Sequence, residues 1–246
     1  MRRVERDASN SPFQLFGWIV LPVSDDRVAD YSGAIDNPST VVKMNERGSL
    51  ILNEVMRDKS NGYETIARSF VQARTPSIGP KVIRAWAKRL VPGASVLDIG
   101  CGHGVPISEA LLQEGFHVYG VDASETLVAE FGKRFPAVVV ECNAIEESRL
   151  FDRTFDAVVA WGLFFLLAPD TQRGLIGKMA RVLNPGGHFL FTSPKEACSW
   201  EDGMTGLTSI SLGQEAYREE LRANGLRLVG NDVDEGENYY YFARKG

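Results

Sequence analysis

VLDIGCGHG, residues 96–104, is an apolar strand that breaks into a glycine-rich turn where a helix should begin. A buried strand needs a continuous run of apolar residues. A turn that adopts positive φ, or passes close to a ligand, needs glycine because a Cβ would be in the way. The stretch meets both conditions and predicts a nucleotide-type ligand site at the end of a buried parallel strand.

The overall composition is that of a soluble globular protein. The 246 residues, 44% hydrophobic and 24% charged, suffice for one large α/β domain with an extension. A net charge of −5 argues against a nucleic-acid partner, which requires a positive field. Cys101, Cys142 and Cys198 are odd in number and widely spaced, so we expect no metal site and no disulfide framework.

The N-terminal region differs from the rest of the chain. Residues 1–60 lack sustained periodicity, so we expect a loosely ordered extension, of which residues 1–43 are dispensable. Its apolar run is short and interrupted, which argues against a targeting or membrane segment. We therefore expect a cytoplasmic protein without membrane contact, either a monomer or a homodimer.

Strand and helix patterns alternate along residues 61–246, after two helices over residues 62–71 and 80–90. Such alternation predicts an α/β fold with a Rossmann-like, doubly wound and mostly parallel sheet. The last two strand patterns are separated by a short turn and predict an antiparallel C-terminal hairpin. The expected strands are 95–100, 117–122, 137–142, 155–162, 188–193, 226–233 and 239–243, and the later helices are 106–114, 124–134, 170–183 and 214–223.

Ligands of an open α/β sheet bind outside the carboxyl ends of the strands. Four features lie at the ends of expected strands or directly after them, and should meet at this edge. They are the glycine turn, Asp122, Asn143 and the pair Trp161–Gly162. Asp122 follows Gly100 at close to the ~20-residue spacing at which an acidic side chain meets ribose hydroxyls. We therefore expect a nucleoside at this edge.

The glycine spacing separates two kinds of ligand. A dinucleotide fingerprint has the form G-x-G-x-x-G, but Val105 occupies the position of the third glycine. Asp98 also brings a negative charge close to where phosphates would lie, and suits a cationic group instead. These residues favour an adenosine ligand that carries an amino acid over NAD.

Several segments of the chain resemble the class I S-adenosylmethionine-dependent methyltransferases that act on small molecules. They are VLDIGCGHG, Asp122, residues 143–145, FDAVVAWG and LNPGGHFLF. The resemblance covers about residues 62–246. It implies a seven-stranded sheet ending in a reversed hairpin, with residues 61–90 as a helical lid. It also implies S-adenosyl-L-methionine as cofactor and methyl transfer to a small molecule by in-line displacement.

The resemblance also implies roles for single residues. Asp122 would hold the ribose hydroxyls, residues 143–145 would border the adenine, and Trp161 would lie beside the sulfonium. Many relatives carry Asp at the position of Asn143, but an amide can both donate to and accept from adenine. The cofactor residues implied are Tyr63, Phe70, Arg74, Asp98, Gly100, Cys101, Gly102, Asp122, Ala123, Asn143, Ala144, Ile145, Trp161 and Gly162.

The acceptor side carries fewer signals. We expect His103, Phe165 and Trp200 near the substrate, with Trp200 in a long connection over residues 194–213. Leu166 and Leu167 are expected in the core. No catalytic residue is assigned, because a sulfonium methyl is already electrophilic and chiefly needs alignment and exclusion of water. The alternatives are a protein or RNA methyltransferase, a non-catalytic S-adenosylmethionine-binding protein and an NAD-linked oxidoreductase.

Overall fold

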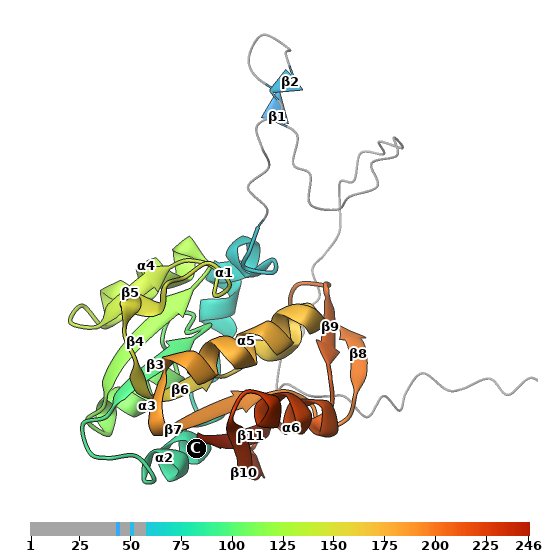
Figure 1. The fold of residues 1–246 in the computed structure, drawn as a ribbon. Helices are drawn as coiled ribbons and strands as arrows, with labels where there is room; N and C mark the ends of the chain where they lie inside the picture. Colours follow the sequence, from blue (N-terminus) through green and yellow to red (C-terminus); the bar gives the residue numbers. More distant parts are fainter. Residues whose placement is uncertain (1–42, 45–49, 52–57) are drawn as a thin grey trace, which may run out of the picture.

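The structure is a computed structural model, and it describes residues 43–44, 50–51 and 58–246 (Figure 1). The loosely ordered extension predicted over residues 1–60, and the dispensable segment 1–43 within it, lie mainly outside these residues. Strands β1 (Lys43–Met44) and β2 (Leu50–Ile51) pair with each other in antiparallel fashion.

A seven-stranded sheet in the order β10-β11-β7-β6-β3-β4-β5 forms the centre of the molecule. Neighbouring strands from β7 to β5 are parallel, whereas β11 is antiparallel to both of its neighbours. The predicted mostly parallel sheet and C-terminal hairpin are confirmed, and β11 alone runs against the others. The strands are β3 (Ser95–Ile99), β4 (His117–Asp122), β5 (Val139–Cys142), β6 (Phe155–Ala160), β7 (Leu183–Thr192), β10 (Leu226–Val233) and β11 (Tyr239–Lys245).

Helices cover both faces of this sheet, as expected for a doubly wound fold (Figure 1). Helices α5 and α6 pack on one face, and α2 and α3 pack on the other. Ser124, the first residue of the expected helix 124–134, is the N-cap of α4, because its side chain accepts a hydrogen bond from the Leu127 amide. The helices are α1 (Tyr63–Ala73), α2 (Pro80–Ala87), α3 (Ile107–Gln113), α4 (Glu125–Arg134), α5 (Pro169–Val182) and α6 (Gln214–Ala223), with short 3-10 turns η1 (Leu150–Asp152) and η2 (Phe164–Leu166).

Side chains alternate between two cores along each central strand, because successive residues of a strand point to opposite faces. In β6, Val158 packs on the face covered by α5, whereas Val159 packs on the face covered by α2. In β11, Tyr240 lies on the face opposite to Tyr239 and Tyr241, as the alternation predicts. The sheet is therefore buried on both faces, and its ligand site lies at an edge.

Two segments differ from the sequence-based expectation. The stretch Asn184–Pro185–Gly186–Gly187 separates the expected helix 170–183 from the expected strand 188–193, but it lies inside β7, where the pairing with β6 shifts between Phe155↔Leu183 and Ala157↔His188. The extra β7 residues form a bulge, in which Gly186 adopts a φ of 74°. Residues 194–213 are not a plain connection, because they contain an antiparallel hairpin of β8 (Cys198–Glu201) and β9 (Thr208–Ser211). These strands are short and rich in Ser and Thr, so they lack the apolar alternation that predicts a strand.

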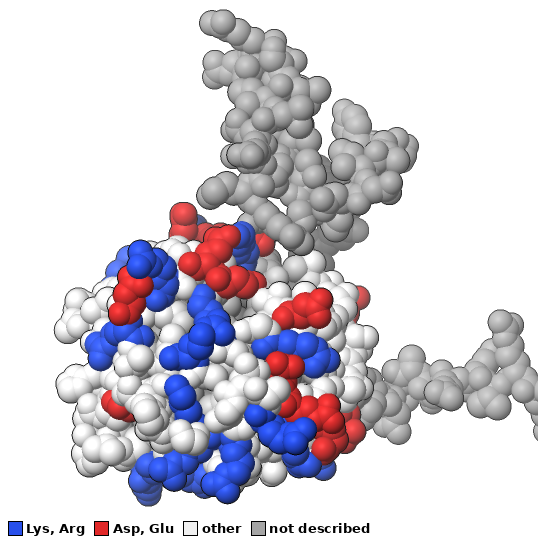
Figure 2. Space-filling model, viewed as in Figure 1, with Lys and Arg blue, Asp and Glu red and all other residues white. Residues whose placement is uncertain are grey.

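Basic side chains gather at one edge of the molecule, although they form no run in the sequence. They come from α6, β10 and β11, and surround a hollow there. Figure 2 shows Lys and Arg gathered along the lower edge of the face in view, whereas acidic and basic side chains are mixed elsewhere on it. The absence of a nucleic-acid partner stays a prediction. The basic side chains of the hollow are Arg218, Arg222, Arg227, Arg244 and Lys245.

Within residues 58–246 we find no helix with both the length and the apolar character that a membrane span requires.

Candidate functional site

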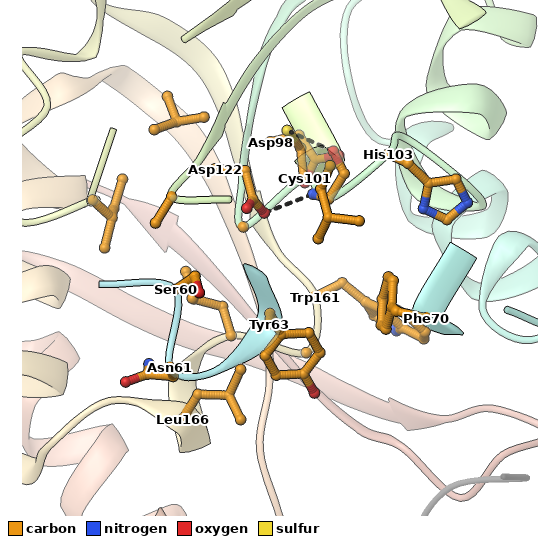
Figure 3. A pocket seen from close by; sticks show the side chains of 18 of the residues that line it. Ser60, Asn61, Tyr63, Phe70, Asp98, Cys101, His103, Asp122, Trp161 and Leu166 are labelled. Carbon is orange, nitrogen blue, oxygen red and sulfur yellow. Dashed lines mark hydrogen bonds between the residues drawn. The ribbon is translucent and has the colours of Figure 1, made fainter. Parts of the chain in front are cut away.

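A cleft lies at the carboxyl ends of β3, β4, β5 and β6, where the sequence predicts the ligand (Figure 3). It encloses about 1060 Å³, including the part open to solvent, and is closed on one side by α1. Most of the predicted site residues line the cleft: Tyr63, Phe70, Arg74, Asp98, Gly100, Cys101, Gly102, His103, Asp122, Ala123, Asn143, Ile145, Trp161, Gly162 and Phe165.

The glycine turn after β3 forms the floor of the cleft. Gly100, Gly102 and Gly104 all have positive φ, at 68°, 54° and 85°. A Cβ at Gly104 would lie 2.5 Å from the Phe135 ring, whereas at Gly102 the nearest atom, on Phe70, is 3.7 Å away. Gly104 is therefore required by packing, while Gly102 presents bare backbone to the cleft.

Asp122 ends β4 and holds the glycine turn to the start of α4. Its Oδ2 accepts a hydrogen bond from the Gly102 amide at 2.8 Å, and its Oδ1 accepts one from the Ser124 amide at 2.9 Å. Burial raises the pKa of this carboxyl group, and the two amide bonds oppose the rise. Because each carboxylate oxygen can accept a second hydrogen bond, the side chain keeps acceptor capacity for ligand hydroxyls.

Asp98 and Arg74 place opposite charges in the same cleft. Asp98 accepts a hydrogen bond from the Ser108 hydroxyl at 2.6 Å, and burial, with the nearby Asp122 carboxylate, raises its pKa to about 7. The Arg74 guanidinium lies 4.0 Å from the centre of the Trp161 ring. Burial lowers the pKa of Arg74 to about 10, so it stays a cation at neutral pH. The pair is complementary to the ammonium and carboxylate of an amino acid.

Trp161 is held by a buried chain of hydrogen bonds. Its Nε1 donates to the Tyr240 hydroxyl at 2.6 Å, and this hydroxyl donates to Asp234 at 2.7 Å. Burial, and then the Asp234 carboxylate, raise the pKa of Tyr240, so the phenol keeps its proton. The indole is thereby fixed with one face against Arg74.

Helix α1 brings an aromatic wall to the cleft. Tyr63 and Phe70 lie edge to face with ring centres 5.3 Å apart. On the same helix, the Glu64 carboxylate accepts hydrogen bonds from Ser124 and Thr126 at the start of α4. These bonds hold α1 over the cleft. Helix α2, which also belongs to the predicted lid of residues 61–90, packs instead against a face of the sheet with α3 and does not line the cleft.

The segment after β5, where the resemblance places the adenine, differs in one residue from expectation. Asn143 and Ile145 line the cleft, and Asn143 donates to Glu141 at 3.0 Å. Ala144 does not line it: the residue is buried, and its carbonyl accepts from the Glu147 and Ser148 amides. Ala144 is therefore enclosed by protein between two residues that line the cleft. Burial of the middle residue has no signature in a three-residue stretch.

The three candidate substrate residues have different surroundings. His103 is buried, and within the described part of the chain its Nδ1 has no hydrogen-bond partner. Burial, and then Arg74, lower the pKa of His103 to about 4, so it is neutral at neutral pH. Phe165 lines the cleft, and the centre of its ring lies 5.4 Å from the centre of the Trp200 ring. Trp200 itself lies in an adjoining hollow and not on the cleft wall.

Several cleft residues were not among those predicted. Leu166 and Leu167, expected in the core, line the cleft, although Leu167 also packs in the core. Their position after Gly162 at the ligand edge was the available signal. Asp202 reaches the cleft from the turn between β8 and β9. It had no signal, because that hairpin was not predicted. The other unpredicted lining residues include Lys59, Ser60, Asn61 and Leu163.

The described side chains of the cleft are better suited to binding a ligand than to reacting with it. Burial raises the pKa of the Cys101 thiol well above its ordinary value, which disfavours the thiolate. No three His, Cys, Asp or Glu side chains in the described ranges are grouped so that they could hold a metal ion. The arrangement suits a ligand with an amino-acid part, vicinal hydroxyls and a flat ring.

Comparison with known proteins finds methyltransferases that are similar to part of the chain. Residues 96–187 match a family model described as a methyltransferase domain. The chain is 35% identical over 106 residues to a ubiquinone biosynthesis O-methyltransferase of Coxiella burnetii, covering 41% of this chain and 44% of that protein. It is 38% identical over 108 residues to a cypemycin N-terminal methyltransferase of Streptomyces, covering 42% and 44%. The chain thus spans less than half the length of these curated relatives.

A solved structure shows the same fold over most of the chain. The 1,6-didemethyltoxoflavin-N1-methyltransferase of Burkholderia thailandensis, with bound 1,6-didemethyltoxoflavin and S-adenosylhomocysteine, matches with a TM-score of 0.64. The match covers 86% of this chain and 98% of that chain, at 19% identity. The Rossmann-like fold inferred from the strand pattern is thereby confirmed.

Proposed function

We propose that this chain, a class I S-adenosylmethionine-dependent methyltransferase by family region and fold, transfers the cofactor's methyl group to a small-molecule acceptor. The observation that carries the proposal is the placement of Arg74, Asp98 and Asp122 in one cleft. These charges match the carboxylate, the ammonium and the ribose hydroxyls of S-adenosyl-L-methionine. An NAD-linked reaction has no comparable support, because Asp98 lies where a pyrophosphate would bind.

The residues of the cleft fit this cofactor. Asp122 has acceptor capacity left for ribose hydroxyls, and Asn143 offers both a donor and an acceptor to adenine. A Cβ at Gly162 would meet nothing within 4 Å, so the backbone there leaves room beside the indole of Trp161. The rings of Tyr63 and Trp161 favour a sulfonium cation, because aromatic faces attract positive charge.

The mechanism asks mainly for positioning. The bound cofactor supplies an activated methyl group. Arg74, Asp98 and Asp122 orient the cofactor, while Tyr63 and Phe70 on α1 exclude water from the reacting atoms. His103 is neutral at neutral pH because burial lowers its pKa to about 4. We assign no catalytic base, since many nucleophiles attack a sulfonium methyl without one.

A small acceptor is supported by the way the cleft is closed. The tip of the β8–β9 hairpin meets the start of α1, so that a Cβ at Gly62 would lie 3.3 Å from Thr205. A protein or RNA segment would have to separate these two elements to reach the sulfonium. A small molecule can be enclosed between them.

Calorimetry with the full chain tests the proposal. We expect S-adenosylmethionine and S-adenosylhomocysteine to bind, and NADH not to bind. A screen of small amines, acids and phenols should then yield S-adenosylhomocysteine with at least one acceptor. NADH binding without a response to the other two ligands would refute the proposal. If S-adenosylmethionine binds but its methyl group is transferred only to protein or RNA, the acceptor is a macromolecule and not a small molecule.

Cofactor affinity should depend on the ionisation of Asp98. Because burial raises its pKa to about 7, the carboxyl group is protonated below that pH and attracts an ammonium group less strongly. We expect S-adenosylhomocysteine to bind about tenfold more weakly near pH 6 than near pH 8, following the ionised fraction. Calorimetry across this range measures the effect. Asp98→Asn should bind weakly at both pH values, and an equal pH dependence in this variant would contradict the assignment.

A further inference from the structure

The β8–β9 hairpin brings one acidic residue, Asp202, to the wall of the cleft. The strands pair from Cys198↔Ser211 to Glu201↔Thr208, so Asp202 opens the turn that joins them. It is 5% exposed and lines the cleft with Tyr63. Asp202 therefore reaches the cleft from the β8–β9 hairpin, which carries none of the residues proposed to bind the cofactor.

The hairpin is anchored firmly enough to position this side chain. Gln172 on α5 donates to the carbonyls of Leu167 and Ile210, at 2.8 and 2.9 Å. The hydroxyl of Tyr217 on α6 in turn donates to Gln172 Oε1 at 2.6 Å. These buried bonds hold β9 to the segment that follows η2. Asp202 is therefore carried by a supported element.

The two oxygens of the Asp202 carboxylate differ in their surroundings. Oδ1 accepts hydrogen bonds from the Met204 amide, the Thr205 amide and the Thr205 hydroxyl, at 3.0, 2.9 and 3.0 Å. Within residues 58–246, Oδ2 accepts no hydrogen bond, and Asp202 belongs to no ion pair. A buried carboxylate gains most from a cationic partner. The open oxygen is thus suited to a positively charged ligand.

The described side chains near Asp202 do not neutralise its carboxylate. Lys59 also lines the cleft, but its ammonium pairs with Glu147. The Tyr63 phenol is close enough that the Asp202 carboxylate, after burial, is the second cause of its raised pKa. Tyr63 therefore stays neutral and offers an aromatic face beside the carboxylate. A carboxylate beside an aromatic ring suits an ammonium group.

We propose that Asp202 binds a protonated nitrogen of the acceptor, so that the substrates are small basic amines. For methylation at this nitrogen, the ammonium first releases one proton to solvent, its lone pair forms the bond to the methyl carbon, and the carbon–sulfur bond breaks to leave S-adenosylhomocysteine. This inference rests on the proposed methyl transfer and names the acceptor class. The rest of the acceptor packs on Phe165 and Leu166, which also line the cleft. Arg74 and Asp98 serve the amino-acid part of the cofactor, which leaves Asp202 for the acceptor.

The Asp202→Asn variant tests this inference. Its amide oxygen can accept the same three bonds from residues 204 and 205, but the negative charge is lost. Thr205→Val is the matched control, because it removes one bond to Oδ1 and keeps the carboxylate. Binding is measured by calorimetry on the full chain saturated with S-adenosylhomocysteine. The ligands are benzylamine, 2-phenylethylamine and butylamine, each compared with the corresponding alcohol and carboxylic acid.

We expect the unchanged chain and Thr205→Val to prefer amines over the matching alcohols by about tenfold or more. In Asp202→Asn this preference should fall to within about twofold, while the affinity for S-adenosylhomocysteine stays within about twofold. An unchanged preference in Asp202→Asn, or no amine preference in the unchanged chain, would overturn the inference. Loss of S-adenosylhomocysteine affinity in Asp202→Asn would assign Asp202 to the cofactor. Methyl transfer to neutral or acidic acceptors alone would overturn this inference while the proposed function stands.

Discussion

Asp122→Ala is expected to weaken the binding of S-adenosylhomocysteine by about 100-fold, or ~2.7 kcal/mol. The substitution removes the acceptor for the ribose hydroxyls inside a closed cleft. It also frees the amides of Gly102 and Ser124, which hold the glycine turn to the start of α4. Both losses weaken the binding of S-adenosylhomocysteine, so the loss of affinity should exceed that caused by removing one ordinary hydrogen bond.

Asp156→Ala is the matched control for this change in affinity. Asp156 accepts bonds from the Ser95 amide, the Ser95 hydroxyl and the Asn184 side chain, and it is absent from the lining of the cleft. Its removal should lower the free energy of unfolding while the affinity for S-adenosylhomocysteine is kept. Calorimetry on both variants, at a temperature where both are folded, separates the two effects. Equal affinity of Asp122→Ala and the unchanged chain would show that the ribose does not bind at the end of β4.

Gly104→Ala is expected to lower the free energy of unfolding by about 2–5 kcal/mol. Gly104 has a φ of 85°, a conformation that costs a residue with a Cβ about 1–2 kcal/mol. The new Cβ would also lie 2.5 Å from Phe135 and 2.9 Å from Phe131, and such overpacking costs about 1–3 kcal/mol more. The loss is large beside the total stability of a domain, about 5–15 kcal/mol.

Gly115→Ala isolates the contribution of the backbone. Gly115 has a φ of 84°, nearly that of Gly104, but a Cβ there would meet nothing within 4 Å. We expect this variant to lose about 1 kcal/mol. Urea unfolding of both variants measures the difference. Similar losses in the two would mean that α4 moves away from the glycine turn at little cost.

The central part of the fold follows from local patterns. Alternating apolar strands and amphipathic helices predict the parallel sheet, and the ends of β3, β4, β5 and β6 gather the residues of the cofactor cleft. Asp122 and Trp161 could be placed in advance because each directly follows an apolar strand, and carboxyl ends of parallel strands share one edge. Glycines with positive φ need no Cβ, so the turn at residues 100–104 is visible in the sequence.

The environment of these residues could not be predicted in the same way. The sequence alone does not indicate that Trp161 donates to Tyr240, that Asp98 is desolvated beside Asp122, or that Arg74 stacks on Trp161. Each contact joins residues that are distant along the chain or depends on burial. Their pKa values and orientations are therefore properties of the packed structure.

Local sequence patterns are enough to predict the central sheet, the glycine turn and most of the residues at the ligand edge, because strand and turn preferences act over a few neighbouring residues. The elements that enclose this edge depend on long-range packing. The β8–β9 hairpin has short polar strands without apolar alternation, and long-range bonds from Gln172 place it. The position of Asp202 on the wall of the cleft follows from that placement, because no local pattern specifies where a hairpin docks.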